Sequence, residues 1–123
     1  MHNKYILHHA NKHGLSENEL YSVYKIFFGT LVSESRLRII NLLRKGRKNV
    51  SEIIEELNME QANVSHDLSR LKKCGFVEVE AEKQYRYYKL NEKTIKPLMK
   101  LIDEHMAKYC VHILHSIKAK EEK

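Results

Sequence analysis

The sequence has little of what turn-rich or disulfide-bonded folds require. Its 123 residues include four glycines, one proline, two cysteines and no tryptophan. So few glycines and prolines argue against a barrel or sandwich built on many tight turns, and helices are expected to dominate. Cys74 and Cys110 cannot form a disulfide scaffold, which favours a reducing, cytoplasmic location.

Long apolar runs are also missing. No stretch approaches the ~20 apolar residues that a transmembrane helix needs. The N-terminus shows no secretory-signal pattern, so no membrane partner is expected. Neither a glycine-rich phosphate loop nor a nucleophile–base arrangement is visible, which makes an enzyme the least favoured class of function.

Positive charge is present in excess. Lysine and arginine number 22 against 16 acidic residues, which gives a net charge of +6 and an isoelectric point near 9.3. A basic balance of this size in one small domain points to a polyanionic partner, with nucleic acid ahead of a membrane surface. One basic run should lie partly near a nucleic-acid backbone; it comprises Arg36, Arg38, Arg44, Lys45, Arg47 and Lys48.

Hydrophobic periodicity predicts one domain at residues 16–118, behind a flexible, histidine-containing arm at residues 1–15. Ser16 and Glu19 form a capping box for a helix over about 17–31. That helix carries one apolar stripe, formed by Leu20, Tyr24, Phe27, Phe28 and Leu31. Ser33 or Ser35 caps a short second helix that stops at Gly46.

Two short helices are predicted within residues 50–74. Asn49 and Glu52 form the capping pair of the first, and Asn58 tolerates the left-handed conformation of a sharp turn. Val64, Leu68 and Leu71 point inward on the second, so polar residues occupy its outer side. This pattern is a helix-turn-helix.

The period changes after Gly75. Valine and alanine alternate with glutamate over residues 77–82, and YRYYKL follows a short turn, which predicts a two-stranded hairpin over about 76–90. Helical periodicity then returns over about 92–117. The predicted fold is mainly α with a small β-hairpin, a winged helix-turn-helix.

Three segments resemble the ArsR-type winged-helix repressors. They are LVSESRLRIINLL (31–43), VSEIIEELNMEQANVSHDLSRLKKCGFVEVE (50–80) and YRYYKL (85–90), in the order and at the spacing of that family. The resemblance implies a homodimeric, sequence-specific DNA-binding repressor that an inducer releases from its operator. A metal-independent regulator of the same type stays open. So does a protein-interaction module of the transcription machinery, although such a module would more often expose apolar residues on this helix and hairpin.

The second helix of the pair is the expected DNA reader, inserted into successive major grooves of double-stranded DNA. Glu60 and Asp67 depart from the family pattern, and we expect Asp67 to pair with Arg70 one turn later. The hairpin tip is expected to contact a phosphate or the minor groove. The candidate DNA-binding residues are Gln61, Asn63, Ser65, His66, Ser69, Arg70, Lys73, Lys83, Gln84 and Arg86.

Apolar residues recur at alternating four- and three-residue steps in the last helix, a pattern typical of coiled coils. They are Ile95, Met99, Ile102, Met106, Tyr109 and Ile113. With the stripe of the first helix they offer more apolar surface than one small domain needs. We therefore expect a homodimer built from the first and last helices, whose two-fold axis suits a palindromic operator.

Histidines suggest a metal-sensing alternative. The last helix carries His105, His112 and His115, the candidate metal ligands, and a transition metal such as zinc or nickel is the candidate effector. His105 and His112 share a flank of the helix, where a second chain or His8, His9 and His13 of the arm could complete a site. The competing interpretation is that they lie at the edge of the dimer interface.

Overall fold

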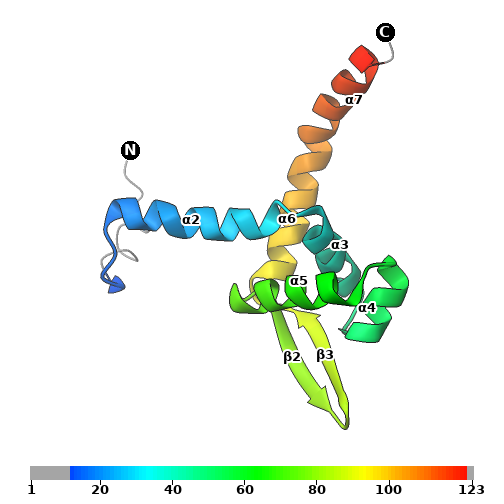
Figure 1. Cartoon of the computed structure of the whole chain (residues 1–123). Helices are drawn as coiled ribbons and strands as arrows, with labels where there is room; N and C mark the ends of the chain where they lie inside the picture. The colour runs from blue at the N-terminus through cyan, green and yellow to red at the C-terminus, as the bar shows by residue number, and fades with distance from the viewer. Residues whose placement is uncertain (1–11, 122–123) are drawn as a thin grey trace.

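The computed structural model describes residues 12–121 and shows a helical body with a small antiparallel sheet (Figure 1). Within these residues no helix is both long and apolar enough to cross a membrane. The elements are α2 (Glu17–Leu31), α3 (Glu34–Leu43), β1 (Lys48–Asn49), α4 (Val50–Leu57), α5 (Gln61–Lys73), β2 (Val77–Glu82), β3 (Tyr85–Leu90), α6 (Ile95–Lys108) and α7 (Cys110–Glu121). The arm predicted at residues 1–15 lies almost wholly outside the described residues.

Local capping signals set the beginnings of the first helices. At α2, Ser16 and Glu19 exchange side chain-to-backbone hydrogen bonds of 3.1 Å in each direction. Asn49 and Glu52 do the same at α4, at 2.9 and 3.0 Å. Ser33 rather than Ser35 caps α3. These side chains satisfy backbone N–H groups that a helix start leaves without partners.

The turn between α4 and α5 depends on one residue. Asn58 adopts φ 51° and ψ 50°, the left-handed conformation that asparagine tolerates better than most residues. At the far end of α5, Gly75 has φ +75° and turns the chain into β2. Helices α4 and α5 therefore form the helix-turn-helix predicted from the sequence.

The sheet has three strands where the sequence predicted two. Strand β3 is central, in the order β1-β3-β2, and β2 and β3 form the predicted hairpin. The added strand β1 pairs Lys48 with Tyr88 and Asn49 with Tyr87. A two-residue strand has no periodicity of its own, so only its long-range pairing reveals it.

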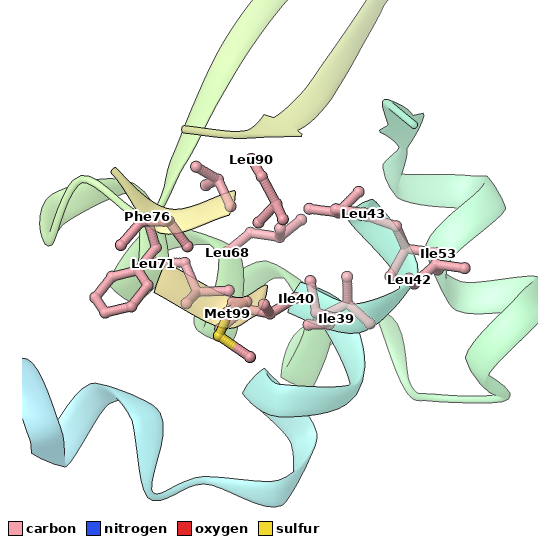
Figure 2. Packing of buried hydrophobic residues seen from close by; sticks show 13 residues of the cluster. Ile39, Ile40, Leu42, Leu43, Ile53, Leu68, Leu71, Phe76, Leu90 and Met99 are labelled. Atoms are coloured by element: carbon pink, nitrogen blue, oxygen red, sulfur yellow. The ribbon is translucent and has the colours of Figure 1, made fainter. Parts of the chain in front are cut away.

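The core lies where α3, α4, α5, β2, β3 and α6 meet. Figure 2 shows Leu68 and Leu71 of α5 among residues of α3, together with Phe76 and Leu90, which both lie at the open end of the hairpin. The inward positions predicted for α5 are confirmed, since Val64, Leu68 and Leu71 are all buried. This packing holds α5 and the hairpin in one body.

Helices α2 and α7 project from this body (Figure 1). The predicted stripe of α2 is divided: Phe27 stacks on Phe76 at a ring distance of 5.1 Å, whereas Phe28 is 54% exposed. The last helix begins at Ile95, three residues later than predicted, and is interrupted at Tyr109, whose φ of −117° departs from helical geometry. Figure 1 shows α7 continuing in the direction of α6.

Candidate nucleic-acid interface

The outer face of α5 is polar and accessible. Because Val64, Leu68 and Leu71 are buried, the opposite face of the helix points to solvent. Six of the predicted site residues are exposed there, namely Gln61, Asn63, Ser65, His66, Ser69 and Lys73. Amide, hydroxyl and imidazole groups in the first two turns can hydrogen-bond to base edges, and the lysine near the end suits a phosphate.

The start of α5 leaves backbone N–H groups without a side-chain acceptor. Glu60 occupies the N-cap position and makes no capping hydrogen bond, and the first turn contains no acidic residue. Free N–H groups and the positive end of the helix dipole favour an anion such as a phosphate. The exposed carboxylate of Glu60 opposes that effect.

The predicted pairing of Asp67 with Arg70 is wrong. Asp67 is 5% exposed and accepts hydrogen bonds from Ser35 Oγ at 2.6 Å and Arg36 Nη1 at 3.3 Å. Arg70 is half-buried, and its Nε donates to Thr30 Oγ1 at 3.0 Å. Asp67 lies on the same helical face as Val64 and Leu71, so its buried carboxylate takes a charged partner from α3. Arg70 is thus directed toward α2, and a phosphate contact for it stays a prediction.

The turn of the hairpin presents the three other predicted residues. Lys83, Gln84 and Arg86 are all exposed, and Lys83 adopts a positive φ of 58° at the turn. Neither Lys83 nor Arg86 makes an ion pair with any described residue. Both positive charges are therefore available to a polyanion.

Ion pairs along the strands brace the hairpin, and one of their cations, Arg47, lies just before β1. Arg47 pairs with Glu80 and Glu82 on β2, and its guanidinium carbon lies 4.3 Å from the centre of the Tyr87 ring. Lys89 reaches Glu80 Oε1 at 2.8 Å. The bonds to Glu82 and then Glu80 raise the pKa of Arg47, and the bonds from Lys89 and then Arg47 lower the pKa of Glu80.

The basic run predicted from the sequence is largely neutralised. Besides the pairs of Arg36 and Arg47, it forms Arg38–Glu34 at 3.0 Å, Arg44–Asp103 at 2.6 Å and Lys48–Glu56 at 3.2 Å. Of the six cations in the run, Lys45 alone makes no ion pair with a described residue. Among the described residues, the cations without an ion pair on α5 and at the hairpin turn are Arg70, Lys72, Lys73, Lys83 and Arg86. Of these, Arg70 is hydrogen-bonded to Thr30 of α2.

The candidate metal ligands do not form a donor set within one chain. His105, His112 and His115 are exposed along α6 and α7, and the ring of His105 lies 4.7 Å from that of Tyr109. Asp103 is engaged by Arg44. No group of three histidine, cysteine or acidic side chains between residues 12 and 121 could hold a metal ion. His8 and His9 of the arm lie outside the described residues.

Comparison with known proteins places this geometry in a family. Residues 33–79, from the cap of α3 into β2, match the arsR family of bacterial regulatory proteins. An HTH-type transcriptional regulator of Methanocaldococcus jannaschii is 34% identical over 87 residues, which cover 70% of this chain and 98% of the relative. The chain belongs to the ArsR family of helix-turn-helix transcriptional regulators.

Two further relatives resemble this ArsR-family regulator. The transcriptional repressor SdpR of Bacillus subtilis is 30% identical over 64 residues, or 52% of this chain and 71% of that protein. A homodimeric winged helix-turn-helix DNA-binding domain from Mycobacterium bovis superposes with a TM-score of 0.69 at 26% identity, covering 80% of this chain and 94% of that one. The ArsR-family chain is a DNA-binding transcriptional regulator and not an enzyme.

In this ArsR-family regulator, the sequence reasoning missed three residues that bear on the interface. Lys72 is an exposed cation of α5 that was not included among the candidates. Arg36 and Thr30 were not connected with α5, although both contact it. A signal existed for Asp67, because it lies three residues after Val64 and four before Leu71, on the apolar face. No sequence pattern names the partner that a buried carboxylate recruits from a distant helix.

Proposed function

We propose that this ArsR-family regulator is a homodimeric repressor whose two copies of α5 and of the hairpin read a palindromic operator. The observation that carries the proposal is where the exposed apolar side chains lie. Within residues 12–121, every exposed large hydrophobic residue except Tyr85 lies on or next to α2, α6 and α7. Patches of this kind on a small domain mark a protein interface.

A second copy of the chain is the partner that suits both helices. The exposed residues continue the predicted coiled-coil spacing beyond the buried Ile95 and Met99 into Met106, Tyr109 and Ile113. The relative from M. bovis is homodimeric, which supports the same arrangement here. A two-fold axis between the copies would present two α5 helices to successive major grooves.

The polar face of α5 supplies the reading groups in this proposal. Gln61 and Asn63 can each form paired hydrogen bonds with an adenine edge, and Ser65 and His66 can contact neighbouring bases or phosphates. Lys73, Lys83 and Arg86 carry unpaired charge for the backbone. The repressor name of the B. subtilis relative supports repression as the outcome of binding.

Release by an inducer is part of the proposal, through a change in the distance between the two α5 helices. The histidines between residues 12 and 121 do not supply a complete metal site, so a metal effector would need donors from two chains or from the arm. Titration of Zn²⁺, Ni²⁺, Co²⁺ and Cu⁺ into the DNA complex, with a His105→Ala/His112→Ala variant beside the parent, tests that alternative. Equal responses of the two proteins would exclude these histidines as the sensor.

The function itself is tested by fluorescence anisotropy on fragments of the DNA around its own gene, at several salt concentrations, with sedimentation of the free protein. We expect a dimer and one preferred fragment, and a log–log salt dependence whose slope is close to −0.9 for each phosphate contact. Double substitution of Asn63→Ala and His66→Ala should remove the preference between fragments while non-specific binding persists. Failure to bind any fragment at low salt would refute the proposal.

A further inference from the structure

Two polar side chains are buried in the described part of the chain. Thr30 in α2 is 0% exposed and Asp67 in α5 is 5% exposed. Burial of a hydroxyl or a carboxylate is costly unless hydrogen bonds replace those lost with water. Both side chains are hydrogen-bonded, and each has at least one partner on another helix. The two residues are therefore points where separate elements are joined by directional bonds.

Thr30 joins α2 to the end of α5. Its Oγ1 lies 2.8 Å from the carbonyl oxygen of Ile26, to which it donates, and accepts from Arg70 Nε at 3.0 Å. The sulfur of Cys74 lies 3.2 Å from the same oxygen. Arg70 and Cys74 belong to the last turn and the C-cap of α5. One hydroxyl thus contacts two side chains of the recognition helix.

Asp67 joins the middle of α5 to α2 through Arg36. While Arg36 Nη1 contacts the Asp67 carboxylate at 3.3 Å, its Nε donates to the Thr30 carbonyl at 2.8 Å and its Nη2 to the Gly29 carbonyl at 3.2 Å. Ser35 holds the second carboxylate oxygen at 2.6 Å. The guanidinium of Arg36, on α3, therefore donates hydrogen bonds to both α2 and α5 and links the three helices.

These bonds also supply hydrogen-bond donors to the backbone carbonyl groups at the C-terminal end of α2. The last carbonyl groups of a helix lack intrahelical partners and carry partial negative charge. The last turn of α2 contains no basic residue of its own. Arg36 from α3 and Arg70 from α5 supply the positive charge instead, because both donate to backbone carbonyls of α2.

Few other side chains settle the orientation of α2. Tyr21, Ile26 and Phe28 are more than half exposed, and the apolar side chains of α2 that pack against the core are Phe27, which stacks on Phe76, and Leu31. Hydrophobic contacts are non-directional, whereas hydrogen bonds to a guanidinium constrain angle as well as distance. The directional contacts between α2 and α5 thus run through the four residues Thr30, Arg36, Asp67 and Arg70, which we call the polar clamp.

We propose that the polar clamp positions the recognition helix relative to α2 and thereby sets the spacing of the two α5 helices in the operator-bound dimer. This inference rests on the proposed homodimer, in which α2 contributes to the interface. A dimer reads two half-sites only when its recognition helices are one DNA turn apart. A clamp that holds this geometry before binding spares the cost of ordering it on the DNA.

Thr30→Val tests the clamp without removing any charge, because valine has nearly the same shape and lacks the hydroxyl. We expect operator affinity to fall at least tenfold, while the mass of the dimer and the salt slope stay those of the parent. Thr30→Ser restores a hydroxyl and should recover most of the affinity. Thr94→Val is the matched control, since Thr94 is exposed and makes no side-chain cap bond. Parental affinity in Thr30→Val would overturn the proposal.

Arg70→Lys and Arg70→Gln separate positioning from direct phosphate contact. Lysine keeps the positive charge of this half-buried site but not the Nε bond to Thr30, so we expect Arg70→Lys to lose affinity as Thr30→Val does. Thr30→Val and Arg70→Gln remove the same hydrogen bond. If the clamp holds, the loss of operator affinity in the double variant should be smaller than the sum of the two single losses. If instead Arg70→Lys binds as the parent does, and only Arg70→Gln lowers the salt slope by about 0.9, Arg70 is a phosphate ligand and the clamp is refuted.

Hydrogen exchange of the free protein provides a readout that does not depend on DNA. Loss of the clamp should speed exchange in the last turns of α2 and α5 together, and leave α7 unchanged. Unaltered exchange at both helix ends in Thr30→Val contradicts the clamp. If the parent binds no DNA, the repressor proposal fails by itself, and the exchange result still decides whether these bonds hold α2 to α5.

Discussion

The segment from α3 to β3 and the projecting helices α2 and α7 place their apolar side chains in opposite ways. The α3–β3 segment supplies most of the buried core, with Ile39, Ile53 and Phe76 at 0% exposure. Helix α7 has no buried residue, although Ile113, Leu114 and Ile117 are as apolar as the core. One part of the chain can satisfy its hydrophobic surface alone, and the other requires a partner. The proposed repressor thus assigns DNA reading and dimerisation to separate parts of one small domain.

The largest effect should come from a phenylalanine of the core. Phe76→Ala removes a fully buried ring that stacks on Phe27, and we expect the free energy of unfolding to fall by about 3–5 kcal/mol. The same change at Phe28, which is 54% exposed, should cost the isolated protomer far less. Urea denaturation at two protein concentrations measures both.

Phe28→Ala should instead reduce the dependence of stability on protein concentration, because that dependence reports the dimer. Equal losses for Phe28 and Phe76 at every concentration would remove the distinction between a self-sufficient core and an unpartnered helix.

The next effect is on the dimer. Ile113→Glu combined with Leu114→Glu places two charges on the exposed apolar side of α7, and each large side chain that leaves an interface costs about 1.5–3 kcal/mol. We expect the dissociation constant of the dimer to rise by about a hundredfold or more. Sedimentation measures the mass, and circular dichroism should show the helical content retained.

Ser116→Glu is the control for this pair, since it adds a charge to the same helix at an exposed polar position. A double variant that sediments as the parent does would mean that α7 lies outside the dimer interface.

The same comparison explains which parts of the structure could be read from the sequence. Capping at Ser16 and Asn49 and the turn at Asn58 depend on residues within one turn of each other, so local rules suffice. The inward face of α5 follows from its period. The strand at Lys48, the partner of Asp67 and the partner of Arg44 depend on distant segments, and no local pattern encodes them.

Which cations are available to bind DNA also depends on distant segments, so it was harder to predict than the helices and their faces. A run of arginines and lysines is visible in the sequence, but whether each cation is available depends on carboxylates that folding brings to it. Arg47 finds Glu80 and Glu82 on a neighbouring strand, whereas Lys83 at the hairpin turn finds none among the described residues. The basic run at residues 36–48 therefore adds little unpaired charge to the candidate residues on α5 and at the hairpin turn.

A third prediction tests this division between free and paired cations. Lys83→Gln and Arg44→Gln each remove one positive charge. We expect Lys83→Gln to lower the magnitude of the salt slope of DNA binding by about 0.9, because its phosphate contact is lost. Arg44 pairs with Asp103 at 2.6 Å, so Arg44→Gln should leave the slope unchanged. Anisotropy titrations across salt concentrations give both slopes, and identical slopes for the two variants would contradict the assignment.

The smallest expected effect is on stability and comes from the ion pairs of Glu80 in the hairpin. Lys89 and then Arg47 lower the pKa of Glu80, so folding favours its carboxylate form. The contribution of Glu80 to stability is complete above the ordinary pKa of a glutamate and is lost as the pH falls through the lowered pKa. Glu80→Gln should therefore be less stable than the parent near neutral pH, and the two should converge in acid. Unfolding by urea across the acidic range measures the difference.

That difference should be small, because Glu80 is partly open to solvent and exposed ion pairs are screened. It should shrink further in about 1 M salt, where the screening length falls to about 3 Å. Glu55→Gln is the matched control, because Glu55 is exposed and makes no ion pair with any residue from 12 to 121. A gap that widens in acid, or one that Glu55→Gln reproduces, would show that the Arg47–Glu80–Lys89 pairs do not brace the hairpin.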